Sequence, residues 1–158
     1  MRSRISLALL TLLAGAALPA AAQGVPNLSG TWVLQLDKSD FGGMGGQIAS
    51  RTDVFDHQEP KLTIKRTVNS AAGENVSNLV YAVDGKPHKN MAGQSELSSV
   101  LSWDAKVLVM VSTVTTPNGE VTITDRYTLS DDGKTLTQAR KITAQGQELN
   151  QTMVLVKS

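Results

Sequence analysis

The sequence predicts an all-β protein folded as a single antiparallel up-and-down β-barrel of eight to ten strands. Beyond the first two dozen residues, apolar and polar residues alternate in short runs, a period of two that is typical of strands with one buried face. Turn-forming residues separate these runs, and no stretch shows the apolar period of a long helix. Strands joined by tight turns pair as neighbours, and a meander this long loses its exposed edges by closing.

The first 22 residues are typical of an export signal. Arg2 and Arg4 precede the apolar run 5–18, and Ala20-Ala21-Ala22 is a small-residue cleavage site. The run is shorter than the roughly 20 apolar residues of a membrane span, and no later run approaches that length. We therefore expect a bacterial, Sec-type signal peptide over 1–22 and a periplasmic or secreted barrel domain over 23–158.

Composition narrows the function classes of the expected domain. Two of the 15 Lys and Arg residues lie in the signal, so the rest of the chain, with 14 Asp and Glu, has a net charge near −1, spread evenly. This balance disfavours a nucleic-acid partner and a polybasic membrane patch. The chain contains no cysteine, which excludes disulfides, a thiolate nucleophile and a cysteine-linked lipid anchor.

The alternating runs fall into order along the chain. They lie at 29–36, 51–58, 61–69, 75–83, 87–91, 94–103, 106–116, 120–130, 135–143 and 147–156. Tight turns are predicted at Asp84-Gly85-Lys86 and at Asp131-Asp132-Gly133-Lys134. Within run 106–116, residues 107–111 are apolar on both faces, so either both faces are covered or an outer patch around Leu108 and Met110 meets a protein partner.

Residues 37–50 interrupt the strand pattern. Gly42-Gly43-Met44-Gly45-Gly46 is too rich in glycine for a stable helix, and we expect a flexible loop over 39–50. The simplest interpretation is a flexible connection. The alternative is a lid over the barrel mouth, with Phe41 and Met44 as its apolar contacts. A phosphate-binding loop is disfavoured because no Lys-Ser pair or helix follows the glycines.

Gly30-Thr31-Trp32 on the first strand, with Asp40-Phe41 soon after, resembles the opening of the calycin barrels, the lipocalins and fatty-acid-binding proteins. The order of Lys38-Ser39-Asp40-Phe41-Gly42, Trp103-Asp104 and Asp132-Gly133-Lys134-Thr135-Leu136-Thr137 also resembles small exported bacterial proteins with lipocalin-like barrels. The resemblance implies a lipocalin-like fold, structural roles for Gly30 and Trp32, and a late cation packed on Trp32, for which Arg140 and Lys157 are the candidates.

The sequence also departs from these families. Fatty-acid-binding proteins carry two short helices where this chain has its glycine loop. They hold a carboxylate with Arg-x-Tyr on a late strand, whereas Arg126 and Tyr127 are adjacent here and must point to opposite faces.

No catalytic constellation stands out. His57 and His88 lie near turns without a partner at metal-ligand spacing, so we expect surface residues and no metal or cofactor. A serine nucleophile elbow is also missing. The candidate ligand-binding residues are the charged or aromatic side chains of possible interior positions, together with the loop contacts: Arg66, Arg126, Arg140, Trp103, Tyr127, Phe41 and Met44. The alternative for each arginine is an outward side chain or an ion pair with Asp125 or Glu96.

These observations favour an exported, monomeric, non-enzymatic barrel that binds a small apolar or amphipathic molecule inside. Arg126 or Arg140 would anchor a polar head group, and Phe41 and Met44 would gate the mouth. The alternative is a filled barrel that serves as a structural or protein-interaction module of the cell envelope and binds no small molecule. Aromatic residues make up only 4% of the chain, so either a cavity or a filled interior is compatible with its lining.

Overall fold

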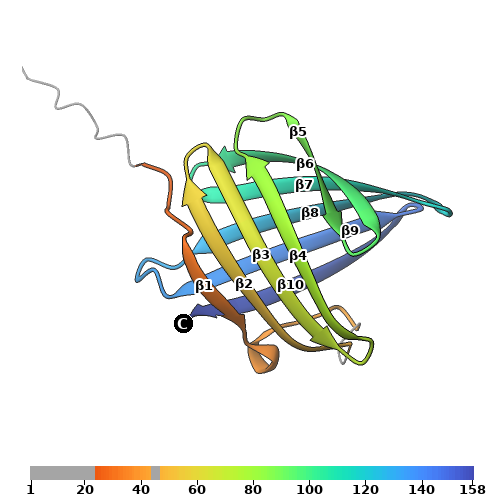
Figure 1. Ribbon diagram of the computed structural model, residues 1–158, viewed down its shortest axis with the longest axis horizontal. Helices are drawn as coiled ribbons and strands as arrows, with labels where there is room; N and C mark the ends of the chain where they lie inside the picture. Colours follow the sequence, from red (N-terminus) through yellow and green to blue (C-terminus); the bar gives the residue numbers. More distant parts are fainter. Residues whose placement is uncertain (1–23, 44–46) are drawn as a thin grey trace, which may run out of the picture.

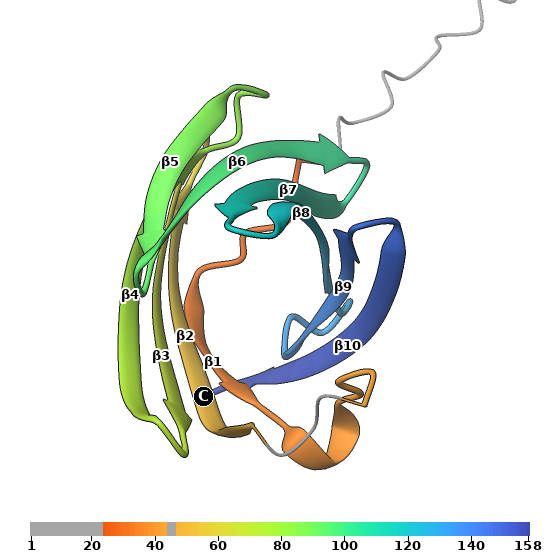
Figure 2. The ribbon, with the colours of Figure 1, turned by 90° about the vertical axis from the view of Figure 1, so that its right-hand side faces the viewer.

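The computed structural model describes residues 24–43 and 47–158, so the predicted signal peptide and Met44 lie outside the described residues. Ten antiparallel strands wind into a nearly closed barrel (Figures 1 and 2). The strands are β1 (Gly30–Leu34), β2 (Ile48–Gln58), β3 (Lys61–Ser70), β4 (Gly73–Ala82), β5 (Pro87–Ala92), β6 (Ser95–Asp104), β7 (Val107–Thr116), β8 (Gly119–Leu129), β9 (Thr135–Ala144) and β10 (Gln147–Lys157). The predicted all-β, up-and-down barrel is confirmed.

The first and last strands close one side of the barrel. The sheet order is β4-β3-β2-β1-β10-β9-β8-β7-β6-β5, and β1 pairs with both β2 and β10. Strands β4 and β5 are therefore the two edges of the sheet and share no ladder. Residues 84–86, predicted to form a tight hairpin, instead connect two edge strands that do not pair.

The strand period of two places one set of side chains inside the barrel. Leu108 and Met110 on β7 are only 0% and 5% exposed, whereas Val111, the next residue of the same strand, is 38% exposed on the outer face. The predicted outward patch at Leu108 and Met110 is therefore wrong. A strand that is apolar on both faces does not reveal from its own sequence which face is inside. Ser112, two positions on, also faces the interior.

Residues 36–43 and the start of β2 are more ordered than a flexible loop predicts. Leu36–Lys38 form a short 3-10 turn, η1, and β2 begins at Ile48, before the predicted start of that strand. Asp40 exchanges two backbone hydrogen bonds of 2.7 Å with Thr152 on β10. The Ser39 hydroxyl accepts a further bond of 3.0 Å from the amide of Val154. The start of the predicted loop is thus fixed to the last strand.

Trp32, on the first strand, lies in the buried core of the barrel. Its side chain is fully buried, and its indole Nε1 donates a hydrogen bond of 2.9 Å to the carbonyl oxygen of Leu28. The ammonium of Lys157 lies 5.3 Å from the ring centroid, a cation–π distance. Of the two candidate cations Lys157 packs on Trp32, and the alternative, Arg140, is wrong because it lies elsewhere in the interior.

Gly30 lies beside Lys157 and has a backbone φ of +139°. An added Cβ would lie 2.5 Å from Cε of Lys157. An alanine at this position would have a strained backbone conformation, and its Cβ would clash with the side chain of Lys157. Gly30→Ala should therefore lower the free energy of unfolding by about 1–3 kcal/mol. Urea unfolding followed by tryptophan fluorescence measures the change. Gly24→Ala, with open space around its Cβ, is the control, and equal stability of the two variants would contradict this role.

Candidate functional site

Six inward-facing polar side chains form a connected cluster within the barrel wall. We call this set the interior polar cluster: Arg51, Asp53, Arg66, Asp125, Gln138 and Arg140. They come from β2, β3, β8 and β9, at strand positions whose alternation directs them inward. A buried charge is costly unless it is paired and hydrogen-bonded, so the contacts within the cluster decide what it can do.

Asp53 holds two guanidinium groups. Arg66 on the neighbouring strand donates from Nε and Nη2 to its two carboxylate oxygens, both at 2.9 Å. Arg51 donates from Nε at 3.1 Å and from Nη2 at 2.5 Å. Asp53 is fully buried, so a single carboxylate compensates two arginines away from water.

Gln138 links this group to a second ion pair. Its amide oxygen accepts from Nη2 of Arg51 at 2.8 Å, and its amide nitrogen donates to Asp125 at 2.8 Å. Asp125 in turn accepts two bonds from Arg140, of 2.8 Å to Nε and 2.9 Å to Nη2. The predicted alternative of an Arg140–Asp125 pair is confirmed, whereas Arg66 pairs with Asp53 and with neither predicted acid.

The interior polar cluster contains three arginines and two aspartates, so it carries one positive charge in excess. Burial by itself would raise the pKa of Asp53, but Arg66 and Arg51 hold it well below its usual range. Burial acts in the same direction on Asp125, and Arg140 and Gln138 lower its pKa. Both carboxylates therefore stay ionised at neutral pH, and the excess charge persists.

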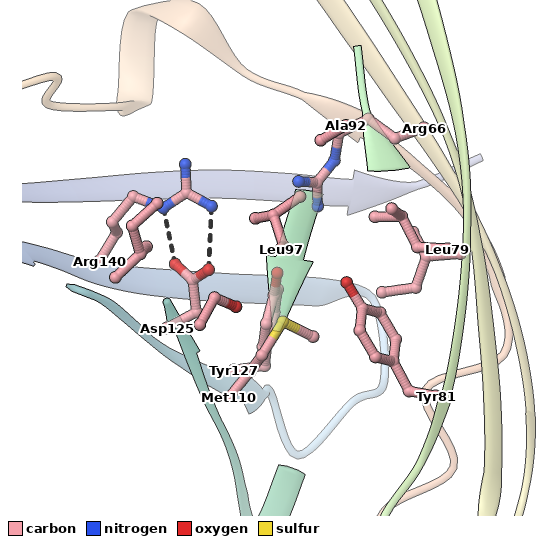
Figure 3. Close-up of a pocket in the computed structure, with 12 residues that line it drawn as sticks. Arg66, Leu79, Tyr81, Ala92, Leu97, Met110, Asp125, Tyr127 and Arg140 are labelled. Carbon is pink, nitrogen blue, oxygen red and sulfur yellow. Dashed lines mark hydrogen bonds and ion pairs between the residues drawn. The ribbon is translucent and has the colours of Figure 1, made fainter. Parts of the chain in front are cut away.

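An inner cavity of about 50 Å³ lies next to the cluster (Figure 3). Apolar side chains form much of its wall: Ile64, Leu79, Ala92, Leu97, Met110 and Ile123. In Figure 3, the hydroxyl ends of Tyr81 and Tyr127 point toward the guanidinium of Arg66. Burial raises the pKa of Tyr81 to about 12 and also raises the pKa of Tyr127. Both hydroxyls therefore remain protonated at neutral pH and can donate hydrogen bonds.

A second hollow of about 260 Å³, which we call the mouth cleft, lies between Phe41 and the start of β2. Its apolar lining is Phe41, Ile48, Val68, Ile142 and Met153. Arg66 and Arg140 line both the mouth cleft and the inner cavity. The two arginines, with their carboxylate partners, therefore stand between the two hollows.

The structure separates the candidate ligand residues. Arg66, Arg140 and Tyr127 line the inner cavity, and Phe41 lines the mouth cleft. Arg126 lies on the outer face with its side chain 45% exposed, paired with Asp104 at 2.7 Å, so an anchoring role inside the barrel is wrong. Its neighbour Tyr127 faces inward, as the strand alternation predicts.

Trp103 lies beside His57 and Glu59 and is not among the residues that line the inner cavity. Its Nε1 donates to Glu59 at 2.8 Å, and its ring centroid is 5.8 Å from that of His57. His57, expected at the surface, is 5% exposed, and its Nδ1 accepts a hydrogen bond of 3.2 Å from the amide of Leu28. Trp103 is therefore not part of the inner cavity, and the expected surface position of His57 is wrong.

Sequence reasoning missed Arg51, Asp53 and Gln138 as members of the site. Arg51 and Asp53 share the inward register of Phe55 and His57, so their spacing on one strand was a usable signal. Gln138 carried no such signal, because a neutral polar residue on a strand is ordinarily solvated.

A cluster of metal-ligand side chains and a long apolar helix are both absent from the described part of the chain. No group of three or more His, Asp or Glu residues lies close enough there to hold a metal ion. Among residues 24–43 and 47–158, no helix has the length and apolar character needed to cross a membrane.

A barrel of this topology with polar residues inside has the calycin fold, of the fatty-acid-binding-protein type. No family model matches the sequence, and no curated protein matches it either. Among solved structures, an SAHS protein of Ramazzottius varieornatus is similar, with a TM-score of 0.60 and 13% identity over 82% of this chain and 94% of that one.

Two other solved structures share the fold. The zebrafish ileal bile acid-binding protein complexed with cholic acid has a TM-score of 0.58 and 12% identity over 82% of this chain and 98% of that one. The fluorescent protein UnaG has a TM-score of 0.59 and 15% identity over 82% of this chain and 96% of that one. Identities this low establish a shared fold, and the predicted calycin-like barrel is confirmed.

Proposed function

We propose that the barrel binds a small amphipathic anion, with its acidic head at Arg66 and Arg140 and its short apolar part in the inner cavity. The observation that carries this proposal is the charge of the interior polar cluster, in which Asp53 serves two guanidiniums and one positive charge is left over. An uncompensated buried charge is unfavourable, and an anionic ligand relieves that cost.

The hydrogen-bonding geometry supports the same assignment. Arg66 and Arg140 each give Nε and Nη2 to a carboxylate, which leaves N–H donors on Nη1 for a ligand. The protonated hydroxyls of Tyr81 and Tyr127 point to the same place (Figure 3). Arginines and hydroxyls that converge next to an apolar wall suit an acid with a short hydrocarbon part.

The fold is compatible with such a role. One protein of similar structure is complexed with cholic acid, which is itself an amphipathic acid. The present barrel departs from it in sequence at almost every position, so its own cluster must define its ligand. We further propose an exported binding protein without catalytic activity, on the basis of the apolar N-terminal run and the absence of a recognisable catalytic arrangement in the sequence.

The second candidate is a filled barrel that serves as an interaction module. The volume of the inner cavity favours it, because about 50 Å³ holds a few water molecules and little more without movement of its walls. Met110 and the half-buried Leu97 are the flexible wall residues that would have to move for a ligand. The two candidates thus differ in whether a small acid binds at all.

Calorimetric titration with octanoate distinguishes them. We expect one octanoate per chain, and we expect Ile123→Phe, which fills the inner cavity, to weaken binding about tenfold or more. Val111→Phe, on the outer face, is the matched control and should bind as the unmodified chain does. No saturable binding would favour the filled barrel, and equal weakening by both variants would place the ligand outside the cavity.

A further inference from the structure

The two sheet edges of the barrel are joined by one side chain. The amide group of Asn90 on β5 accepts a hydrogen bond of 2.7 Å from the backbone N–H of Val80 on β4. It also donates one of 2.9 Å to the carbonyl oxygen of Val80. Asn90 therefore reproduces the two bonds of a ladder partner at a single position, where the strands themselves make no ladder.

The neighbouring backbone groups of β4 lack such a partner. Alternate residues of a strand turn their N–H and C=O groups to the same edge, so Val76 and Asn78 face β5 as Val80 does. Among the described residues, no hydrogen bond crosses from these groups to β5. The slit between β4 and β5 is thus held by polar bonds only at the Asn90–Val80 contact, which we call the clip.

The inner cavity lies directly behind this slit. Leu79 and Tyr81 line it from β4, and Ala92 lines it from β5, so both edges of the slit form part of its wall (Figure 3). Separation of β4 and β5 would expose apolar lining and would break no buried ion pair. The clip itself is exposed to solvent, where water can replace its two hydrogen bonds.

The route from the mouth cleft is obstructed by comparison. Arg66 and Arg140 line both hollows, and each is held by two hydrogen bonds to a buried carboxylate. An apolar group that enters from the mouth must pass this layer of charges. Parting a buried ion pair costs more than parting an exposed amide from a backbone group.

We propose that the inner cavity is entered through the slit between β4 and β5, and that Asn90 is the clip that keeps this entrance closed. The proposal rests on the proposed function for the identity of what enters, while the route itself can be tested without a ligand. In this proposal Asn90 sets the rate at which a ligand enters and leaves the cavity, whereas Arg66 and Arg140 set the affinity for it.

The absence of cysteine from the sequence permits a direct test. A thiol is placed in the cavity wall as Ser112→Cys, a near-isosteric change at a side chain that is 3% exposed, and its modification by N-ethylmaleimide is followed by mass spectrometry. Adding Asn90→Ala should raise the labelling rate about tenfold, because two hydrogen bonds of the closed form are lost. Asn90→Asp, which retains the acceptor but not the donor, should give an intermediate rate.

Three controls separate slit opening from other causes. Asn78→Ala changes an exposed asparagine of β4 outside the clip and should leave the rate unchanged. Phe41→Ala widens the mouth cleft and should also have no effect. A second reporter, Leu136→Cys, is fully buried and does not line the inner cavity, so its labelling should not respond to Asn90→Ala unless the whole barrel loosens.

The outcomes are distinct for the route and for the proposed function. The slit is not the entrance if Asn90→Ala leaves the labelling rate of Ser112→Cys unchanged. The same conclusion follows if Phe41→Ala accelerates that labelling as much as Asn90→Ala does, or if Asn90→Ala accelerates labelling of Leu136→Cys equally. If the labelling result is as expected but octanoate does not bind, the slit stands and the proposed function fails. If octanoate binds, Asn90→Ala should speed its association and dissociation about equally and leave its Kd unchanged.

Discussion

The Asp53→Asn variant is expected to lose about 3–5 kcal/mol of unfolding free energy, because the change removes the charge that pairs with both Arg51 and Arg66. Arg51 is 3% exposed, and the side chain of Arg66 is 17% exposed, so both guanidiniums would lose their carboxylate in largely buried surroundings. Urea unfolding at pH 7 followed by tryptophan fluorescence measures the loss. Trp32 lies opposite Asp53 in the β1–β2 pairing, so far-UV circular dichroism is followed as a second probe of the same transition.

Two further variants show whether charge is the cause. Asp104→Asn removes an exposed partner of Arg126 and should leave stability nearly unchanged. The double change of Asp53→Asn with Arg66→Met removes one of the two stranded charges and should recover part of the loss. If Asp53→Asn proves as stable as Asp104→Asn, the buried carboxylate does not hold the cluster together.

In the Arg66→Met variant, the Kd for octanoate should rise roughly 10- to 100-fold, the size of effect expected when a charged hydrogen-bond donor to a ligand is removed. The loss of stability should be smaller than in Asp53→Asn, because Asp53 keeps Arg51 as its partner. Isothermal titration calorimetry gives the affinity, and urea unfolding gives the stability of the same preparation.

Arg126→Met is the matched control for this change. Arg126 is on the same barrel but on its outer face, and it lines neither the inner cavity nor the mouth cleft. Its replacement changes the net charge of the protein by the same amount and should leave the octanoate Kd unchanged. Equal weakening by both variants would mean that octanoate responds to overall charge and not to a site at Arg66.

The fold could be predicted from local signals because a meander is specified locally. Alternation and turn residues mark the strands, and short turns decide which strands are neighbours. The β4–β5 edge was missed for the same reason. The sequence of residues 84–86 favours a turn, but whether the flanking strands then pair depends on barrel closure at β1 and β10, which is a property of the whole sheet.

The site could be predicted only in part. Arg66 and Arg140 stood out as charges on otherwise apolar strand faces, and both lie inside. Arg126 carries the same signal, yet its neighbour Tyr127 is the inward residue, because the sequence of a single strand does not fix which of its faces is inside. The pairing of Arg66 with Asp53 joins two strands, and its geometry follows from their register, in which Asp53 lies opposite Arg66.

A comparison of head groups on one hydrocarbon chain tests the central claim most directly. Octanoate, octanol and octylamine are titrated into the same protein at pH 7.5, where the acid is an anion and the amine a cation. If the excess positive charge of the interior polar cluster selects the ligand, octanoate should bind most tightly, octanol more weakly, and octylamine not measurably. Equal binding of all three, or preference for octylamine, would contradict an anion site formed by Arg66 and Arg140.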